Sequence, residues 1–594
     1  MSVHFLSRIR RVTHTFSPTE QVLFWIFSIA LLWSLVGVVV DASSKIMVPI
    51  PRPGGEFTEG IVGYPRFINP LFALSDADRD MTALVYSGLL AYEPDGTLIP
   101  DLAQSYTISA DKLQYTFTLK PDITFHDGTP ITADDILFTI QRAKDPAIKS
   151  PKRANWEGVT VEKRSDRDIV FSLRQPFPAF LENTTLGILP SHLWKPIDPE
   201  QFIFSDLNIL PVGSGSYRID AISRDQSGRP RTYTLKSYDA YALGMPYIKT
   251  LTLSFYANEE SLLTALSAGD IDAVNGITPT EARAISINNT TLAIKHVPLP
   301  RIFSVFFNQN KNAGLFANKE VRVALNNIVD KDAIIEKVFS GYATPVDSPL
   351  PPNVRLKVDT SVTASSSPLW TIDQAKQSLE KAGWKKNKDG IYEKTVKKQK
   401  HLLQFSLSVP SVPELKATAE LLAAMWQSIG ADVTLKFFDP NDFSQNVLRP
   451  REYEALLFGE IVGRDIDLFA FWHSSQRNDP GLNIALYTNI KADKLLSEAR
   501  TIDNPTDRLI RYTKFEDEIK KDIPAIFLYS PDFIYIIDTK VGGVSLGRIT
   551  TPAERFLGIR DWYTDTDRVW ESLQKIGNRT IGAPWRQLIE NIRQ

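Results

Sequence analysis

The sequence of 594 residues contains no cysteine, and it has only seven histidines and five methionines. Without cysteine, the chain cannot form a disulfide, a thiolate nucleophile, a cysteine-ligated zinc site or an iron–sulfur cluster. A lipid-modified N-terminal cysteine is excluded for the same reason. The formal net charge is only -2, from 67 basic and 69 acidic residues. This near balance gives no reason to expect nucleic acid as a partner.

Motifs of hydrolases, nucleotide-binding proteins and histidine metal sites are also missing: there is no H-E-x-x-H, no G-x-S-x-G and no Walker A sequence. The adjacent acids Asp134 and Asp135 stand where a helix is expected to begin, and a capping role is enough to explain them. The segment 211–217 (PVGSGSY) has alternating glycines, but no Lys-Ser or Lys-Thr follows it. The sequence therefore predicts no enzyme, no metal site and no cofactor.

One long apolar run is present, at Val22–Val40, and its length is about that of a helix that crosses a bilayer. Three arginines precede it, so the positive-inside rule predicts a cytoplasmic N-terminus at 1–21 and an extracytoplasmic remainder. We expect an uncleaved signal anchor at 22–40 and a stiff, proline-rich stalk at 41–55. A cleaved signal peptide is the alternative, although the run is long for one and no clear cleavage site follows it.

The segment 100–143 predicts a compact β-β-α unit. Three apolar residues alternate with threonines in the pattern of a half-buried strand, namely Tyr115, Phe117 and Leu119. A second strand is expected at 123–125, followed by a tight turn at Asp127-Gly128. Thr132 has the properties of a helix N-cap, because acids follow it in the first turn.

The order of these pieces resembles the signature of the family 5 extracellular solute-binding proteins, the peptide and nickel receptors of ABC importers. The matching residues are Pro100, Leu102, Ala103, Tyr106, Ser109, Asp111, Tyr115, Phe117, Leu119, Phe125, Asp127, Gly128, Thr132, Ala133 and Asp135. A second match spans 321–345, where the family has V-R-x-A-L and a later G-x-A-x-P. The resemblance covers about residues 55–561.

The resemblance implies an α/β fold with two lobes, of the periplasmic-binding-protein type II with an inserted third subdomain, preceded by one transmembrane helix. The predicted parts are lobe I at 56–89, 207–299 and 530–594, its inserted subdomain at 90–206, and lobe II at 300–529. Three tryptophans near the end predict an ordered C-terminal extension, namely Trp562, Trp570 and Trp585.

The function that the resemblance implies is capture of an oligopeptide between the lobes and its delivery to ABC transporter permease subunits. The partners would be the peptide, the permease and, through the N-terminal helix, the cell membrane; the protein is expected to be a monomer. Two alternatives stay open at this point. One is a sensing module on the same fold that serves no transporter, and the other is a receptor for nickel or haem.

In peptide-binding members of the family, an acid in the loop after one lobe II strand pairs with the α-amino group of the ligand. This sequence has Ile461 and Val462 where that acid is expected, and Glu460 is the nearest carboxylate. The predicted cleft contacts are Tyr64, Arg66, Glu460, Arg464, Trp472, His473 and Asn483. For Tyr64, packing beneath its own loop is the alternative.

Overall fold

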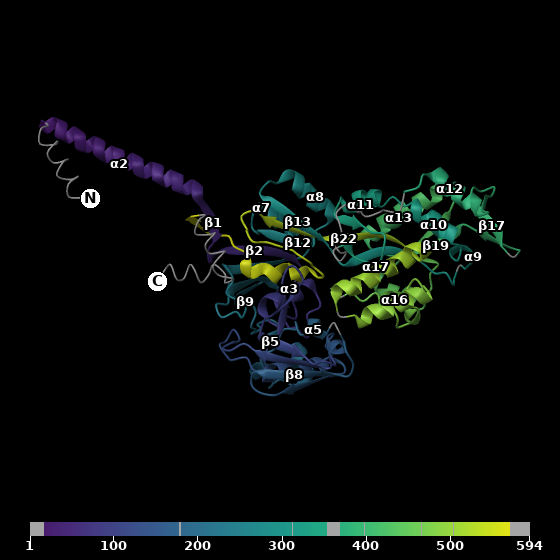
Figure 1. Cartoon of the computed structure of the whole chain (residues 1–594), viewed down its shortest axis with the longest axis horizontal. Helices are drawn as coiled ribbons and strands as arrows, with labels where there is room; N and C mark the ends of the chain where they lie inside the picture. Colours follow the sequence, from purple (N-terminus) through teal and green to yellow (C-terminus); the bar gives the residue numbers. More distant parts are fainter. Residues whose placement is uncertain are drawn as a thin grey trace. The chain divides into compact units, whose positions relative to one another are not determined.

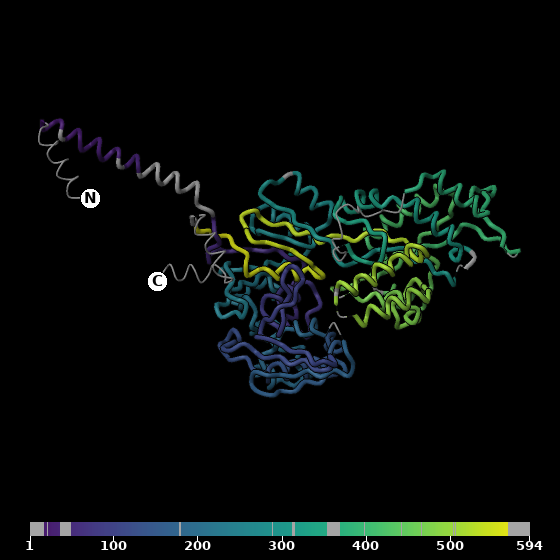
Figure 2. The backbone as a smooth tube through the Cα atoms, viewed as in Figure 1, coloured from purple at the N-terminus to yellow at the C-terminus, as the bar shows by residue number. Residues whose placement is uncertain are grey.

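The computed structural model describes residues 17–177, 180–311, 313–352, 369–396, 398–464, 466–502 and 504–570. The chain forms two units: one joins residues 1–55 to 563–594, and the other is Glu56–Trp562. Figure 1 labels the helices and strands, and Figure 2 traces the same backbone. Most of the predicted cytoplasmic N-terminus and the predicted contribution of Trp585 lie outside the described residues.

In the first unit, the apolar run forms helix α2 (Pro18–Ile46). Its stretch Pro18–Leu35 is long and apolar enough to cross a membrane, and none of this stretch is buried in the structure. Large side chains such as Phe27, Leu31 and Trp33 are at least 70% exposed. A helix with so much exposed apolar surface needs lipid or protein to cover it.

The range 41–55, predicted as a stiff, proline-rich stalk, begins as the last residues of α2 and continues as a strand. Strand β1 (Met47–Pro51) follows α2 directly and pairs antiparallel with β23 (Thr566–Trp570). Arg52 adds ion pairs to Asp565 at 3.3 Å and to Asp567 at 3.5 Å. The prolines of β1 are compatible with this ladder because both strands of a two-stranded sheet have a free edge. Residues 563–570 thus belong to the N-terminal unit, whereas the sequence had assigned them to lobe I.

The second unit is organised around one 12-stranded sheet that both lobes share. We use lobe I for residues 56–299 with 530–562, and lobe II for residues 300–529. Along the sheet the order is β20 (Asp432–Phe438), β19 (Gln404–Pro410), β21 (Ala455–Ile461), β14 (Arg301–Phe307), β22 (Ala525–Asp538), β12 (Ala273–Asn275), β2 (Gly54–Val62), β11 (Ile248–Tyr256), β10 (Pro230–Ser237) and β9 (Tyr217–Arg224), with β13 (Leu292–Pro298) and β15 (Ala343–Pro345) also paired to β22.

The chain crosses between the lobes at two adjacent points. Strand β22 pairs with β14 in lobe II through its first residues and with β13 in lobe I through its last ones. The second crossing is Leu299-Pro300, between β13 and β14. Leu299 N–H donates to Pro531 O at 2.9 Å, and Ser530 Oγ donates to Leu299 O at 2.6 Å. Two hydrogen-bonded strands of this kind form a hinge about which two lobes can rotate.

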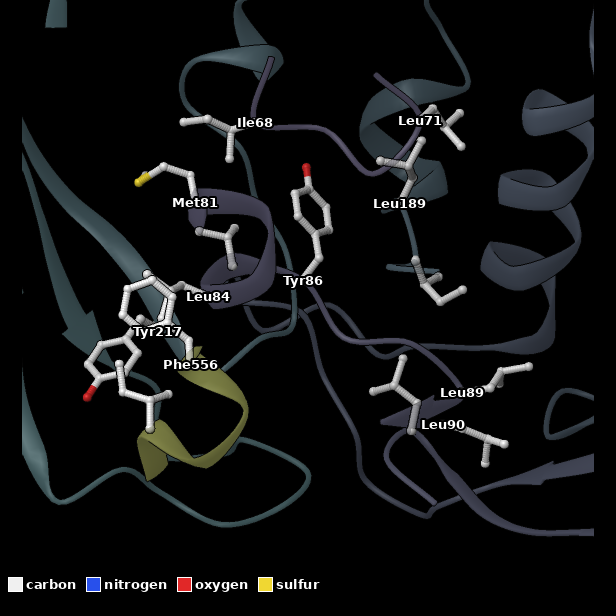
Figure 3. Close-up of a cluster of buried hydrophobic side chains, with 14 of the residues drawn as sticks. Ile68, Leu71, Met81, Leu84, Tyr86, Leu89, Leu90, Leu189, Tyr217 and Phe556 are labelled. Carbon is white, nitrogen blue, oxygen red and sulfur yellow. The ribbon is translucent and has the colours of Figure 1, made fainter. Parts of the chain in front are cut away.

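Lobe I has one large hydrophobic core, to which helix α3 (Asp76–Val85), β2 and the 3-10 helix η7 (Pro552–Asp561) all contribute. Figure 3 shows Leu84 of α3 beside Phe556 of η7 and Met81 near Ile68, with Tyr86 among the other labelled side chains. Ser75 begins α3 with a capping box in which its hydroxyl accepts from the Asp78 backbone.

The inserted part of lobe I carries the predicted β-β-α motif. Strand β6 (Gln114–Leu119) buries its apolar residues and lies in the four-stranded sheet β5 (Ala103–Ile108), β6, β8 (Asp168–Leu173) and β7 (Val159–Lys163). Helix α4 (Ala133–Lys144) begins after Thr132, whose backbone N–H donates to Asp135 at 2.9 Å, as predicted. The second predicted strand is wrong: only the isolated bridge Thr124–Pro130 forms there, because the turn follows too closely for a ladder.

Lobe II covers both faces of its part of the sheet, and strand β21 shows why. Ala455 and Leu457 point into one core, and Leu456 points into another. A strand buried on both faces must be apolar at successive positions, as this one is. The covering helices are α10 (Lys319–Asn327), α11 (Lys331–Phe339), α12 (Ile372–Lys381), α13 (Pro413–Ser428), α16 (Ile490–Thr501) and α17 (Pro505–Asp522).

The remaining elements are short. They include the helices α5 (Phe180–Asn183), α6 (Ser191–Trp194), α7 (Glu259–Ala268), α8 (Pro279–Asn288), α9 (Ala313–Phe316), α14 (Pro440–Phe443) and α15 (Phe469–Trp472). Besides β1 and β23, the strands outside the two larger sheets are β3 (Leu90–Tyr92), β4 (Leu98–Pro100), β16 (Lys385–Lys386), β17 (Tyr392–Val396) and β18 (Gln399–Leu402).

The alternating glycines of 211–217 pack against the end of α3. A Cβ on Gly213 would lie 2.0 Å from the carbonyl oxygen of Val85, and one on Gly215 would lie 2.4 Å from that of Leu84. Only glycine permits this approach of two backbones. The segment therefore fixes the position of α3 as the chain re-enters the main sheet at β9.

A fully buried ion network ties three elements of lobe I together. Arg555 of η7 donates to both carboxylate oxygens of Asp80 on α3, at 2.7 Å each. Its Nε donates to Glu59 of β2 at 2.6 Å, and Tyr535 of β22 donates to the same carboxylate at 2.8 Å. Burial opposes the charge of Arg555, but Asp80 and Glu59 outweigh it and raise the pKa of the guanidinium.

Candidate functional site

A cavity of about 380 Å³ lies in lobe I between α3, β3 and η7. One face of α3 and its C-cap supplies Arg79, Thr82, Ala83 and Tyr86, which follow the i, i+3, i+4, i+7 spacing of a helix face. The opposite wall comes from η7, and the segment Thr185–Gly187 closes a third side. Ala83 is exposed, so the cavity opens to solvent beside it.

Several polar atoms that line this cavity lack a hydrogen-bond partner among the described residues. They are Thr82 Oγ1, Tyr86 OH, Tyr92 OH and Asp101 Oδ1. Tyr86 is only 6% exposed, and its burial raises the pKa of the phenol. A buried polar atom without a partner costs free energy unless water or a ligand satisfies it. These atoms therefore mark the cavity as a place where a hydrogen-bonding molecule is stabilised.

The floor of the cavity is acidic. Asp101 is 3% exposed, and burial raises the pKa of its carboxyl to about 7, with Ser87, Lys120 and Arg560 acting in the opposite direction. Both cations have other partners: Lys120 donates to Ala242 O at 2.9 Å, and Arg560 donates to Glu93 at 2.6 Å.

The rim of the cavity is basic. Arg79 and Lys152 both line it, and they come from different segments of the chain. Burial lowers the pKa of Lys152, and the charge of Arg79 lowers it further. Arg79 is 3.6 Å from Asp76, but both side chains of that pair are largely exposed and screened by water. An anionic group at this rim would relieve the repulsion between the two cations.

Lobe II reaches this site through Arg464, in the loop after β21. The guanidinium of Arg464 lies 4.0 Å from the ring centre of Tyr92 and forms an ion pair with Glu554, and both of these lobe I residues line the cavity. It also donates to Arg548 O at 3.0 Å. Arg464 does not itself line the cavity, but its contacts with two lining residues bridge the two lobes beside it.

The two predicted residues of lobe I lie outside the cavity lining. Tyr64 is 38% exposed, and the guanidinium of Arg229 lies 5.4 Å from its ring centre. Arg66 is exposed; its backbone N–H donates to Asp78 at 2.7 Å, and its guanidinium lies 5.9 Å from the ring of Phe67. Their exposure leaves both side chains open to solvent.

Glu460 and Trp472 lie together in the interior of lobe II. Glu460 is 5% exposed, and burial raises the pKa of its carboxyl well above the ordinary range, which the nearby Trp472 partly opposes. Neither Glu460 Oε1 nor Trp472 Nε1 has a well-formed hydrogen bond among the described residues. Trp472 has no exposed surface, because it packs against Phe306 and Phe527.

The last two predicted residues stabilise their own loop. Asn483 has no exposed surface; its amide donates to the carbonyl oxygens of Trp472, His473 and Tyr487, and its oxygen accepts from the Tyr487 backbone. The ring of His473 stacks on Phe469 at 4.0 Å and contacts Ser475 at 2.8 Å. These contacts use the hydrogen-bonding capacity of Asn483 within lobe II.

The sequence did not single out Tyr86 or Asp101 as site residues. Tyr86 belongs to the motif V-Y-x-x-L, where it was read only as part of the pattern, and Asp101 stands at the unspecified position of P-x-L-A. An acid between two apolar residues at the end of a strand was the one available signal for Asp101. Metal binding has no support in the described ranges, where no group of three or more His, Asp or Glu side chains could hold an ion.

Two α/β lobes that share one sheet through a two-strand hinge, with a ligand-sized cavity bridged by a residue of the opposite lobe, define a two-lobed solute-binding protein. The model of the bacterial extracellular solute-binding proteins, family 5, middle region, matches residues 97–508. The chain belongs to this family, whose members are non-enzymatic, extracytoplasmic substrate-binding proteins of ABC transporters. The resemblance, the fold class and the absence of enzymatic function predicted from the sequence are thereby confirmed.

Three relatives illustrate the similarity. The oligopeptide-binding protein AppA of Bacillus subtilis is 28% identical over 506 residues, which cover 83% of this chain and 89% of AppA. Its structure in complex with a nonapeptide superposes with a TM-score of 0.62 at 26% identity, covering 86% of this chain and 99% of AppA. The structure of the substrate-binding protein CtaP of Listeria monocytogenes gives a TM-score of 0.69 at 27% identity. The match covers 86% of this chain and 100% of CtaP. The structure of NikZ of Campylobacter jejuni, in complex with Ni(L-His), gives a TM-score of 0.64 at 26% identity. The match covers 86% of this chain and 99% of NikZ.

Proposed function

We propose that the protein captures oligopeptides between its two lobes and delivers them to the permease subunits of an ABC transporter. The observation that carries this proposal is the position of Arg464, a lobe II residue that contacts Tyr92 and Glu554 at the edge of the lobe I cavity. A ligand in the cavity would therefore contact lobe I residues that Arg464 holds from lobe II, and it would favour closure if it bound the closed state better, since a ligand shifts an equilibrium toward the state it binds better.

The lining of the cavity suits a peptide better than a metal ion or an apolar molecule. Hydroxyl groups, an acid at the floor and cations at the rim offer both donors and acceptors, which a peptide backbone requires. Of the predicted contacts, Arg464 is the one that we retain at this cavity. Tyr64, Arg66 and His473 remain proposals for the outer part of the cleft. Glu460, Trp472 and Asn483 are buried inside lobe II, so lobe II itself would have to rearrange before they could contact a ligand.

We also propose that helix α2 stays attached and anchors the protein in the cell membrane, with the lobes outside. Its exposed apolar side chains and its length support an anchor. Intact-mass measurement of the protein from its own membranes is the test. A mass that includes residues 1–44 supports the anchor, and a mature chain that begins after residue 40 supports a cleaved signal peptide.

The test of peptide capture is mass spectrometry of the small molecules that leave the purified full chain when it is denatured with acid. Released peptides of a narrow length range would support the proposal. Release of nickel with a small chelator would support a metal receptor instead. Release of neither, together with an unchanged melting temperature when peptide mixtures are added, would favour a sensing module that serves no transporter.

A further inference from the structure

The floor of the lobe I cavity carries an acid that is held in place but not neutralised. Asp101 directly follows β4, and its backbone N–H donates to Leu89 O at 3.0 Å, so its position is fixed by the fold. The side chain is 3% exposed, lines the cavity, and has an oxygen without a partner among the described residues. A fixed acceptor that points into a cavity is prepared for a donor from a ligand.

The two cations whose charges act on Asp101 each have another hydrogen-bond partner. Lys120, after β6, donates to Ala242 O, and Arg560 of η7 is paired with Glu93. Tyr241 also faces this region, and its own burial keeps its phenol neutral. Burial raises the pKa of the Asp101 carboxyl to about 7, because Ser87, Lys120 and Arg560 offset only part of the cost of burying its charge.

We propose that Asp101 receives the ammonium group of the peptide ligand, so that the peptide enters the cavity with its amino end first. This inference rests on the proposed function and specifies how the ligand is oriented. The cations Arg79 and Lys152 at the rim would repel an ammonium group there and attract the carboxylate side of the ligand. Thr82 Oγ1 and Tyr86 OH, both without partners in the described chain, supply hydrogen bonds between the two ends.

This orientation predicts that peptide binding releases a proton and that the affinity depends on pH. An ammonium group next to Asp101 favours its ionised form, so binding at or below pH 7 releases a proton from the carboxyl. Affinity should therefore rise as the pH increases from 6 toward 7.5 and then level off. A ligand that met Asp101 with a neutral or anionic group would show no such rise.

The experiment uses the full chain in detergent and a peptide mixture from a pepsin digest of casein, half of it acetylated on its amines. Captured peptides are eluted with acid and identified, and one captured peptide is then titrated by calorimetry in free and acetylated form. We expect the free form to bind roughly 10- to 100-fold more tightly, the range for a hydrogen bond to a charged group. Asp101→Asn should remove this difference, because the two changes affect the same contact.

Asp111→Asn is the matched control, because Asp111 is an exposed acid at the β5–β6 turn. The peptide affinity of this variant should equal that of the wild type. A single cooperative thermal unfolding transition would show that the Asp101→Asn variant is folded. If free and acetylated peptides bind equally, or if Asp101→Asn binds both as the wild type does, the inference is overturned while peptide capture stands. If the wild type captures no peptide at all, the proposed function fails and the inference fails with it.

Discussion

The buried network of Arg555, Asp80 and Glu59 allows a stability prediction with a magnitude. Arg555→Met replaces the guanidinium with an apolar side chain and removes three charge-assisted hydrogen bonds, of 2.7, 2.7 and 2.6 Å. Arg555 and both acids have no exposed side-chain surface. Breaking a buried ion pair by removing one partner costs about 3–5 kcal/mol. We therefore expect the free energy of unfolding at pH 7.5 to fall by about that amount.

The decrease in the free energy of unfolding caused by Arg555→Met should depend on pH, and its direction can be stated. Burial already raises the pKa of Asp80 in the wild type, and without Arg555 the folded-state pKa should rise further above its unfolded value. Folding the variant then requires uptake of a proton, so the variant loses stability as the pH rises from about 4 through this raised pKa. The deficit relative to the wild type should be smaller at pH 5 than at pH 7.5.

Urea unfolding of the full chain in detergent, followed by tryptophan fluorescence at pH 5 and pH 7.5, measures the free energy of unfolding and its dependence on pH. Trp562 is a suitable reporter because its ring packs edge-on against Phe57, 5.7 Å away, in the same core. Arg500→Met is the matched control: its ion pair with Asp467 is nearly half exposed on both sides, so its loss should cost less than about 1 kcal/mol. A deficit below about 1 kcal/mol for Arg555→Met, or one independent of pH, would refute the reasoning.

Three further predictions concern single positions. Gly215→Ala places a Cβ against the backbone of Leu84 and should lower stability by about 1–3 kcal/mol or more in the same urea assay; a neutral effect would contradict the close packing. Asp135→Ala removes the acceptor for the backbone N–H groups of Thr132 and Ser191, at 2.9 Å each, and should cost roughly 2–4 kcal/mol, measured in the same way. Because the pKa of Asp101 is raised to about 7, the wild type should lose stability between about pH 4 and 7 relative to Asp101→Asn; parallel pH profiles would exclude a buried titrating acid.

The sequence alone determined the local structure and the class of protein. The alternation of Tyr115, Phe117 and Leu119 predicted β6, and the acids after Thr132 predicted the start of α4, because these signals depend on neighbours within one strand or one helical turn. The ordered motif between Pro100 and Asp135 was sufficient for the family, since each of its pieces is local.

Only the tertiary structure decided which side chains meet. Trp472 and Asn483 have the chemistry of ligand contacts, but packing and loop carbonyls use them within lobe II. Asp101 stands at the unspecified position of P-x-L-A and carried no motif signal in the sequence, yet folding leaves it as the acid at the floor of a cavity. The pairing of β1 with β23, more than 500 residues apart in the chain, has no local signal either. Burial and distant pairing depend on the whole chain, and periodicity within a segment cannot encode them.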